Sequence, residues 1–441
     1  MKTILVANRG EIACRVIKAA KDEGYQTVAV YSQADADSPF VDMADQAVAL
    51  KGNAASETYL DIGLIIEAAR SSGADAIHPG YGFLSENAEF ASACAEANIT
   101  FIGPSSSAID AMGNKGTAKR LMIEAGVPCI PGFEAPNASD DELLAAAVDV
   151  GFPLMVKAAA GGGGRGMRLV ETIEGLASAI SSARLESLNA FSSEEMILER
   201  AFVGARHIEI QIAADQHGNV VHLAERDCSV QRRHQKVIEE APSTCLNQAL
   251  RSSMGEAAIL AAKAVSYVGV GTVEFLLDED DQFYFLEMNT RLQVEHPVTE
   301  CVTGIDLVSL QFSIAEGGTL PLSQEDVTLS GHAIEVRIYA EDPSQSFRPQ
   351  TGTVLIYEAP HGNGVRVDSG IRQGSEISPY YDAMIAKLIA WGETRDIARR
   401  RLVNALRGTT VLGLTTNKAF LPQLLEHPGF VSGFATTAMI D

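Results

Sequence analysis

The sequence predicts a soluble globular protein of mixed α/β and α+β class with two or three domains. The chain has 441 residues, of which 46% are hydrophobic and 21% charged, a composition that supports substantial folded cores. Apolar runs alternate with helical patterns over roughly the first 110 residues, as in parallel α/β domains. Later segments are typical of successive strands joined by turns, which favours antiparallel sheet.

The first 110 residues show a repeated strand and helix order. Strands are predicted at 3–7, 26–31, 74–78 and 100–103, with helices over 11–23, 59–71 and 88–97. Ligands of parallel sheets bind outside the C-terminal strand ends. Those ends carry residues 8–10 and 78–82 in this chain.

A second unit begins after Pro128 and Pro131 interrupt the pattern. Its predicted elements are strands at 152–158, 196–199, 208–213, 220–225, 272–277 and 282–288 and a helix near 173–184. The strands from 208 onward indicate a largely antiparallel sheet, with a polar turn at 278–281. The last third begins with a strand at 331–339 and ends with a helix over 395–406, and we expect a separate α+β domain there.

Charge and cysteine content narrow the class of protein. The net charge of −23 disfavours a nucleic-acid partner. Six dispersed cysteines without a C-x-x-C pair are typical of reduced thiols in a cytoplasmic protein. No signal peptide is expected, because the sequence enters a predicted strand directly after its first residues. No membrane span is expected either, because no stretch approaches 18 uninterrupted apolar residues. A mitochondrial matrix protein without its presequence would have the same features.

Five polar side chains occupy every second position near residue 290: Glu287, Asn289, Arg291, Gln293 and Glu295. An extended backbone would place all five on one face. Interleaved carboxylate, carboxamide and guanidinium groups predict a metal and anion site there. An amphipathic surface strand is the alternative for such a segment taken alone.

Residues 161–166 satisfy the dinucleotide fingerprint G-x-G-x-x-G, which would suggest a dehydrogenase. That fingerprint requires a helix after the loop, whereas residues 167–170 have the pattern of a return strand. A strand, glycine loop and strand form a hairpin that can close over phosphates. A mobile loop without a ligand is the alternative.

Two lysines and two glutamates extend this picture. Lys115 precedes a helix and Lys157 precedes the glycine run, so both could neutralise nucleotide phosphates, although either alone could be a surface residue. The turn at 278–281 sets Glu274 and Glu287 on one face of a hairpin, where with Asn289 they suit Mg²⁺. The polar segment 225–236 is either part of the same site or a solvated loop, and His234 either a ligand contact or a structural histidine.

With these residues in view, the chain resembles the biotin carboxylase component of biotin-dependent carboxylases, an ATP-grasp family, from residue 4 to 440. The motifs that carry the resemblance are ANRGEIA at 7–13, HPGYGFLSEN at 78–87, the glycine run, ERDCSVQRRHQK at 225–236 and EMNTRLQVEHPV at 287–298. The resemblance implies a Rossmann-like N-terminal domain (1–112), an ATP-grasp domain (113–328) with a lid at about 130–203, and a C-terminal biotin carboxylase domain (329–441).

The resemblance also implies roles for individual residues. The implied ATP contacts are Lys115, Lys157, Gly163, Gly164, Gly166, Met167, Glu199, Arg200, Phe202, His207, Gln231, His234 and Leu276. The implied ligands of Mg²⁺, or of Mn²⁺ in its place, are Glu274, Glu287 and Asn289. Lys236, Arg291, Gln293 and the Val294 amide match the bicarbonate pocket, Glu295 the base, and Arg337 the group that stabilises the biotin enolate.

The implied reaction carboxylates biotin with bicarbonate and ATP through carboxyphosphate. Two departures from the family pattern stand out: the adenine-side segment reads Glu199-Arg200-Ala201-Phe202, and no Ala-Met-Lys-Met motif carries biotin. Biotin is therefore expected on a separate carrier protein or domain, with a carboxyltransferase partner and a homodimer or larger assembly. We expect a stand-alone subunit or, with slight preference, the excised domain of an acyl-CoA carboxylase α subunit.

Two other functions are compatible with parts of this pattern. A different ATP-grasp ligase, acting through an acyl phosphate on an amine, would share the nucleotide and magnesium residues. It would not need the bicarbonate and biotin set, which is Lys236, Arg291, Gln293, Glu295 and Arg337. A catalytically idle nucleotide-binding scaffold would lack at least one catalytic residue, and all matched positions are present.

Overall fold

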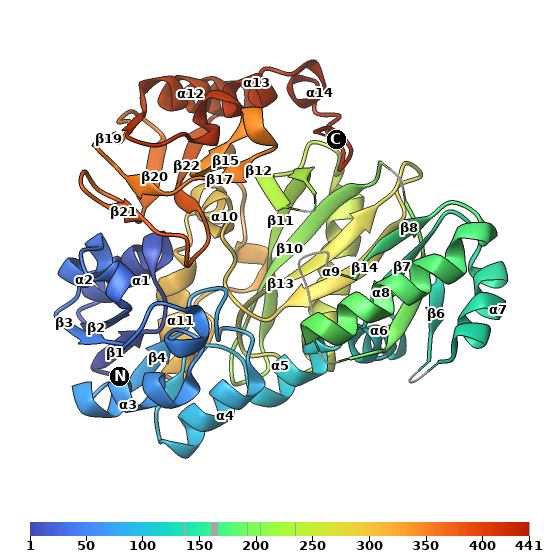
Figure 1. The fold of residues 1–441 in the computed structure, drawn as a ribbon, viewed down its shortest axis with the longest axis horizontal. Coiled ribbons are helices and arrows are strands. Elements are labelled where there is room, and N and C mark those ends of the chain that lie inside the picture. Colours follow the sequence, from blue (N-terminus) through green and yellow to red (C-terminus); the bar gives the residue numbers. More distant parts are fainter. Residues whose placement is uncertain (136–137, 160–165, 192, 203, 234, 441) are drawn as a thin grey trace.

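The computed structural model describes residues 1–441 except 136–137, 160–165, 192, 203, 234 and 441 (Figure 1). Gly163, Gly164 and His234, three of the predicted ATP contacts, therefore lie outside the described residues.

The N-terminal part is the predicted parallel α/β unit. Its five strands lie in the order β3-β2-β1-β4-β5, and every neighbouring pair is parallel. The elements are β1 (Thr3–Val6), α1 (Gly10–Asp22), β2 (Gln26–Tyr31), α2 (Pro39–Met43), β3 (Gln46–Ala49), α3 (Ile62–Ser72), β4 (Ala76–His78), α4 (Ala88–Glu96) and β5 (Thr100–Phe101). The prediction of a parallel sheet is confirmed.

The C-terminal part of the chain covers the start of α1, at the strand ends where such sheets usually bind ligands. A Cβ atom on Gly370 would lie 2.5 Å from the Glu11 nitrogen. Asn8, which follows β1, donates hydrogen bonds to the carbonyls of Pro79 (2.7 Å) and Tyr81 (2.8 Å). These bonds connect the loop after β1 to the loop after β4. The first and last parts of the chain therefore pack directly on each other (Figure 1).

A smaller sheet contains the two strands that precede and follow the glycine run in the sequence. Its order is β6-β9-β7-β8, and its elements with the preceding helices are α5 (Ser106–Gly113), α6 (Lys115–Glu124), β6 (Gly132–Glu134), α7 (Asp140–Val150), β7 (Leu154–Ala158), β8 (Arg168–Val170), α8 (Leu176–Phe191) and β9 (Met196–Arg200). β7 and β8 pair antiparallel, with Leu154 opposite Val170. The return strand after the glycine run is thus confirmed, which removes the dehydrogenase fingerprint.

The large sheet has eight strands in the order β14-β13-β10-β11-β12-β15-β22-β20, and all their pairings are antiparallel, as predicted. They are β10 (Arg206–Ala214), β11 (Val220–Arg232), β12 (Gln235–Ala241), β13 (Gly269–Leu277), β14 (Phe283–Asn289), β15 (His332–Tyr339), β20 (Val365–Ser369) and β22 (Met384–Gly392).

This sheet extends into the last third of the chain. β12 pairs with β15, with Ile238 opposite Val336, so strands from the middle and the last third of the chain form one continuous sheet. Both side chains are buried in a shared core, so the α+β unit expected in the last third is joined to the middle of the chain through this sheet. The domain boundaries remain predictions.

The remaining elements surround this sheet. They are α9 (Gln248–Ala264), α10 (His296–Thr303), α11 (Leu307–Ala315), β16 (Glu341–Asp342), β17 (Arg348–Pro349), β18 (Gly352–Thr353), β19 (Ile356–Glu358), β21 (Glu376–Ile377), α12 (Arg395–Gly408), β23 (Thr410–Leu412), α13 (Leu421–Leu425) and α14 (Pro428–Val431). In the described part of the chain no single helix has the length and apolar composition of a membrane span, and α10 with α11 reaches them only as a pair bent by 95°.

Candidate active site

The site lies on one face of β10 and β13, and strand periodicity explains why. Ile208, Ile210 and Ile212 of β10 are buried in a core that includes α9. Since side chains alternate along a strand, the residues between them, Glu209 among them, project from the opposite face. One sequence pattern thus builds the core on one side of the sheet and a polar site on the other.

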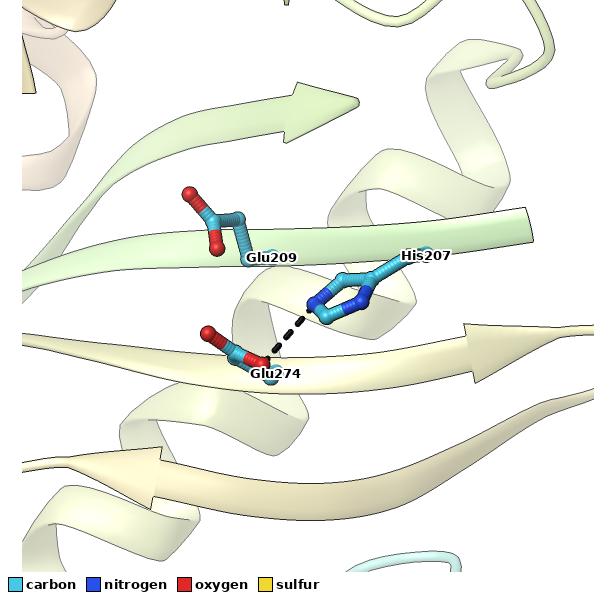
Figure 2. A group of neighbouring side chains, drawn as sticks. All are labelled: His207, Glu209 and Glu274. Carbon is cyan, nitrogen blue, oxygen red and sulfur yellow. Dashed lines mark ion pairs between the residues drawn. The ribbon is translucent and has the colours of Figure 1, made fainter. Parts of the chain in front are cut away.

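The predicted hairpin register is confirmed. Glu274 of β13 lies opposite Glu287 of β14 and, on its other side, opposite Glu209 of β10. Figure 2 shows Glu209 and Glu274 beside His207, with the imidazole directed at the Glu274 carboxylate. The His207 Nε2 atom lies 2.8 Å from Glu274 Oε2. Burial disfavours the charged imidazole, but the Glu274 carboxylate outweighs burial and raises the pKa of His207.

The polar stripe is only partly a strand. β14 ends at Asn289, and α10 begins at His296, so the extended conformation predicted for 287–295 is wrong beyond Asn289. Side chains of the stripe nevertheless meet at Glu274, because Asn289 Nδ2 and Gln293 Nε2 each donate to Glu274 Oε1 at 2.8 Å. Arg291 donates to Asn289 Oδ1 and to Glu86 Oε2, both at 2.7 Å.

Lys236 connects three carboxylates at the centre of the site. Its ammonium nitrogen lies 2.6 Å from Glu209, 2.8 Å from Glu274 and 2.7 Å from Glu295. Burial alone would lower the pKa of this amine, but the three carboxylates raise it well above its usual value. Lys236 is therefore a permanent cation, and the alternative of a solvated loop for residues 225–236 is wrong: Val220–Arg232 and Gln235–Ala241 are the paired strands β11 and β12.

Glu295 lies between two cations. Lys236 donates to Oε1 at 2.7 Å, and Arg337 donates to Oε2 at 3.0 Å. Burial opposes ionisation of this carboxyl, but Lys236, Arg337 and Arg226 prevail and lower its pKa. Arg337 also donates to Glu239 at 2.7 Å. Burial raises the pKa of Glu239 to about 7, although Arg337 acts in the opposite direction.

The two lysines predicted for phosphate binding are both paired with carboxylates. Lys115 Nζ lies 2.6 Å from Glu287 Oε2, and Lys157 Nζ lies 2.5 Å from Glu199 Oε2. The Lys115 backbone nitrogen donates to the Ala159 carbonyl at 3.0 Å, which brings the start of α6 to the end of β7. A cavity of about 330 Å³ opens beside Lys115, Glu287 and Asn289.

The remaining predicted ATP contacts border the small sheet and the edge of the large one. Phe202 stacks on Tyr284, with ring centroids 4.9 Å apart, and the Arg200 guanidinium lies 5.7 Å from the Phe202 ring. Leu276 lies opposite His207 in the β10–β13 pairing, and Gln231 lies 2.8 Å from His207 Nδ1. Gly166, with φ of +70°, accepts a hydrogen bond from the Ala158 nitrogen, and the next residue is the half-buried Met167.

The donor set fits a hard divalent cation. Glu274 and Glu287 are adjacent carboxylates, and the Asn289 amide lies beside them. The Lys115 cation lowers the pKa of Glu287, and although burial opposes ionisation of Glu274, Lys236 and His207 lower its pKa as well. Ionised carboxylates with an amide oxygen are the ligands that Mg²⁺ prefers.

Sequence reasoning missed several buried polar residues of the site. Glu209 anchors Lys236, Glu239 anchors Arg337, and Lys387 donates to the Val294 carbonyl at 2.5 Å. Arg226 is fully buried between the strands. Their one signal in the sequence is a charged residue at an alternating position inside a strand. That signal can be interpreted only once the strand and its neighbours in the sheet are known.

Three family models together match most of the chain. Their descriptions are biotin carboxylase, N-terminal domain (residues 1–109), carbamoyl-phosphate synthase L chain, ATP binding domain (114–323), and biotin carboxylase C-terminal domain (335–441). The fold and the site thus define an ATP-dependent ligase with an ATP-grasp core.

Individual relatives narrow the class. The chain is 49% identical to biotin carboxylase 1 of Bacillus subtilis over 442 residues, covering 100% of this chain and 98% of that protein. It is 52% identical over 438 residues to the mitochondrial methylcrotonoyl-CoA carboxylase subunit alpha of Dictyostelium discoideum, covering 99% of this chain and 63% of that subunit. The chain therefore spans less than two thirds of that relative's length.

A solved structure agrees with these relatives. The biotin carboxylase domain dimer of 2-oxoglutarate carboxylase from Hydrogenobacter thermophilus, a complex with MgADP, ADP and bicarbonate, matches with a TM-score of 0.96 and 45% identity over 99% of this chain and 96% of that one. The chain belongs to the biotin carboxylase family, whose reaction is the ATP-dependent carboxylation of biotin, the first half-reaction of a biotin-dependent carboxylase.

Proposed function

We propose that this chain carboxylates biotin on a carrier protein and that Glu295 is the general base that activates bicarbonate. One observation carries the proposal: Glu295 is held by Lys236 and Arg337, at 2.7 and 3.0 Å, in the same cluster as the candidate metal ligand Glu274. A base, an anion-binding cation and a metal ligand are therefore connected by direct contacts.

Bicarbonate is a weak nucleophile, so its proton must leave before it attacks phosphorus. Lys236, Arg291, Gln293 and the Val294 amide form the proposed anion pocket. In the structure Lys236 is shared among three carboxylates. When an anion draws Lys236 away, Glu295 loses a counter-charge and its pKa rises toward that of a more effective base.

ATP supplies the phosphoryl group. Lys115, Lys157 and His207 are the proposed phosphate contacts, Gln231 and His234 the ribose contacts, and Glu199, Arg200, Phe202 and Leu276 the adenine side, while Gly163, Gly164, Gly166 and Met167 belong to the lid. Glu274, Glu287 and Asn289 would hold Mg²⁺, which neutralises charge on the transferred phosphoryl group. Because each lysine is paired with a carboxylate before ATP arrives, binding exchanges one anion for another.

The proposed reaction proceeds in defined bond-forming and bond-breaking steps. An oxygen of deprotonated bicarbonate attacks the γ-phosphorus, and the bond to ADP breaks, giving carboxyphosphate. Carboxyphosphate splits into carbon dioxide and phosphate, phosphate removes the biotin N1 proton, and N1 attacks carbon dioxide. The Arg337 guanidinium stabilises the biotin enolate during this step.

The finer assignments rest on the family. We propose that a biotin carrier protein or domain delivers biotin, that a carboxyltransferase accepts the product, and that the chain forms a homodimer or larger assembly. We also propose a reducing compartment, the cytoplasm or the mitochondrial matrix, because all six cysteines are free thiols. The domain boundaries at 112 and 328 belong to the same proposal.

The test measures ADP release from MgATP and bicarbonate, with and without free biotin, for this protein and for its Glu295→Ala and Lys236→Ala variants. We expect biotin-stimulated turnover that falls about 10²- to 10⁴-fold in Glu295→Ala, the usual contribution of a general base. ATP binding without any bicarbonate-dependent turnover in the unmodified protein would contradict the proposal.

A further inference from the structure

Arg226 of β11 is a fully buried arginine with a partner for every N–H group. Nε donates to Glu209 Oε1. Nη1 donates to Gln211 at 2.6 Å and Thr299 at 2.9 Å, and Nη2 donates to Thr272 at 3.0 Å and Gln293 at 2.7 Å. These partners come from β10, β13, α10 and the loop before α10, so one guanidinium joins four segments behind the site.

Two of these partners lead directly into the proposed bicarbonate pocket. Glu209 accepts from Arg226 with one oxygen and from Lys236 with the other, at 2.6 Å. Gln293 accepts from Arg226 with Oε1 and donates with Nε2 to Glu274 at 2.8 Å. Arg226 therefore stands behind two of the pocket's donors without contacting the anion position itself.

The Gln293 contact fixes the polarity of an amide. A carboxamide has an acceptor on one side and donors on the other, and a guanidinium can only donate. Arg226 therefore holds Oε1 inward, and because one Nε2 hydrogen donates to Glu274, the other is left to face the pocket. Without Arg226 the reversed amide would present an acceptor to an anion, which is repulsive.

Resting on the proposed function, we propose that Arg226 is the positioning residue of the bicarbonate pocket: it orients the Gln293 donors toward the anion and anchors Lys236 through Glu209. A lysine cannot replace it, because only the planar fork reaches Glu209 and Gln293 at once. A buried ion pair by itself is weak evidence for a role in stability. Kinetic measurements are therefore needed to distinguish a role in the bicarbonate pocket from a role in folding.

The first experiment measures KM for bicarbonate and KM for MgATP in ADP release by Arg226→Lys and Arg226→Met. Hydrogen bonds to charged groups predict that KM for bicarbonate rises at least about tenfold, while KM for MgATP changes less than twofold. Thr299→Val is the matched control, because it removes a partner of Arg226 that contacts neither Lys236 nor the proposed bicarbonate pocket. We expect this variant to leave KM for bicarbonate and KM for MgATP within twofold. Equal rises in both KM values for the Arg226 variants would indicate a general structural role and overturn the proposal.

The second experiment is a double-mutant cycle between Arg226→Met and Gln293→Glu. With Arg226 present, the glutamate places a carboxylate oxygen where donors face the anion, so KM for bicarbonate rises. In the Arg226→Met background the orientation is already lost, and we expect the double effect to fall at least about fivefold short of the product of the single effects. Multiplicative effects would overturn the proposal.

Three further outcomes are distinguishable. If Arg226→Met does not fold, as judged by its thermal melt, Arg226→Lys takes its place in the double-mutant cycle with Gln293→Glu. If the unmodified protein shows no bicarbonate-dependent ADP release, the proposed function fails and the role of Arg226 fails with it. Turnover by the unmodified protein with an unchanged KM for bicarbonate in both Arg226 variants overturns the role of Arg226 alone.

Discussion

At the scale of single residues, the site is organised by charges that are already paired. Lys115 contacts Glu287, Lys157 contacts Glu199, and Lys236 contacts three carboxylates. Each cation and each carboxylate thus avoids the cost of unpaired burial. A substrate has to replace an existing partner, which favours ligands that bring both a metal cation and an anion.

The proposed metal ligands predict an effect of charge removal. Glu287→Gln keeps the shape of the side chain but gives the cation one carboxylate fewer, so we expect the Mg²⁺ concentration for half-maximal ATP turnover to rise about tenfold, the equivalent of about 1.4 kcal/mol. Titration of activity with Mg²⁺ at saturating ATP measures it. Asp280→Asn, in the turn of the same hairpin, is the control, and an unchanged Mg²⁺ requirement in Glu287→Gln would remove Glu287 from the metal site.

At the scale of elements, the β12–β15 pairing places two buried carboxyls side by side. Glu239 lies opposite Glu335, and both are fully buried. Both oxygens of Glu335 lack a hydrogen-bond partner among the described residues. Burial raises the pKa of Glu335 well above its usual value, with Lys387 opposing the shift and Glu239 adding to it. Glu335 therefore holds its proton more tightly in the folded protein than in the unfolded chain.

The raised pKa of Glu335 predicts a pH dependence of stability. Above pH 4.5 the unfolded chain releases the Glu335 proton, whereas the folded protein retains it, so stability falls as pH rises toward the folded-state pKa. Glu335→Gln removes this titration. Thermal denaturation at pH 5.5 and pH 8.5 gives the difference in melting temperature between the variant and the unmodified protein. We expect this difference to favour the variant more at pH 8.5 than at pH 5.5. A constant difference would show that Glu335 ionises normally.

The elements also show what the sequence could and could not predict. Strand alternation correctly paired Glu274 with Glu287 and located the turn between them. It failed after Asn289, where Pro297 in the first turn of α10 favours a helix start and where the backbone leaves the sheet. The polar β11 could not be distinguished from a loop, because the groups that satisfy Arg226 come from strands and a helix distant in the sequence.

At the scale of the whole molecule, the first and last parts of the chain meet at a glycine. A Cβ on Gly370 would lie 2.5 Å from the Glu11 nitrogen and 2.7 Å from the Gly10 carbonyl carbon. No flexible side chain can move aside there, because the contacted atoms are backbone. The contact requires residue 370 to lack a side chain.

Gly370→Ala should therefore weaken the packing between α1 and the C-terminal part of the chain. We expect a loss of roughly 1–3 kcal/mol in the free energy of unfolding, as for other overpacked sites, measured by chemical denaturation. Gly362→Ala is the matched control, since its Cβ would meet only the Val365 side chain at an ordinary 3.5 Å. Equal stability of the two variants would show that α1 and the C-terminal part separate readily.

The continuous large sheet has a consequence for dividing this chain. A cut near residue 329 would separate β12 from β15 and leave two open edges, with Ile238 and Val336 uncovered beside them. Each fragment alone would carry a template for self-association. The two fragments produced together would instead offer each other the missing edge, which makes this junction a natural position for a split protein that reassembles by strand pairing.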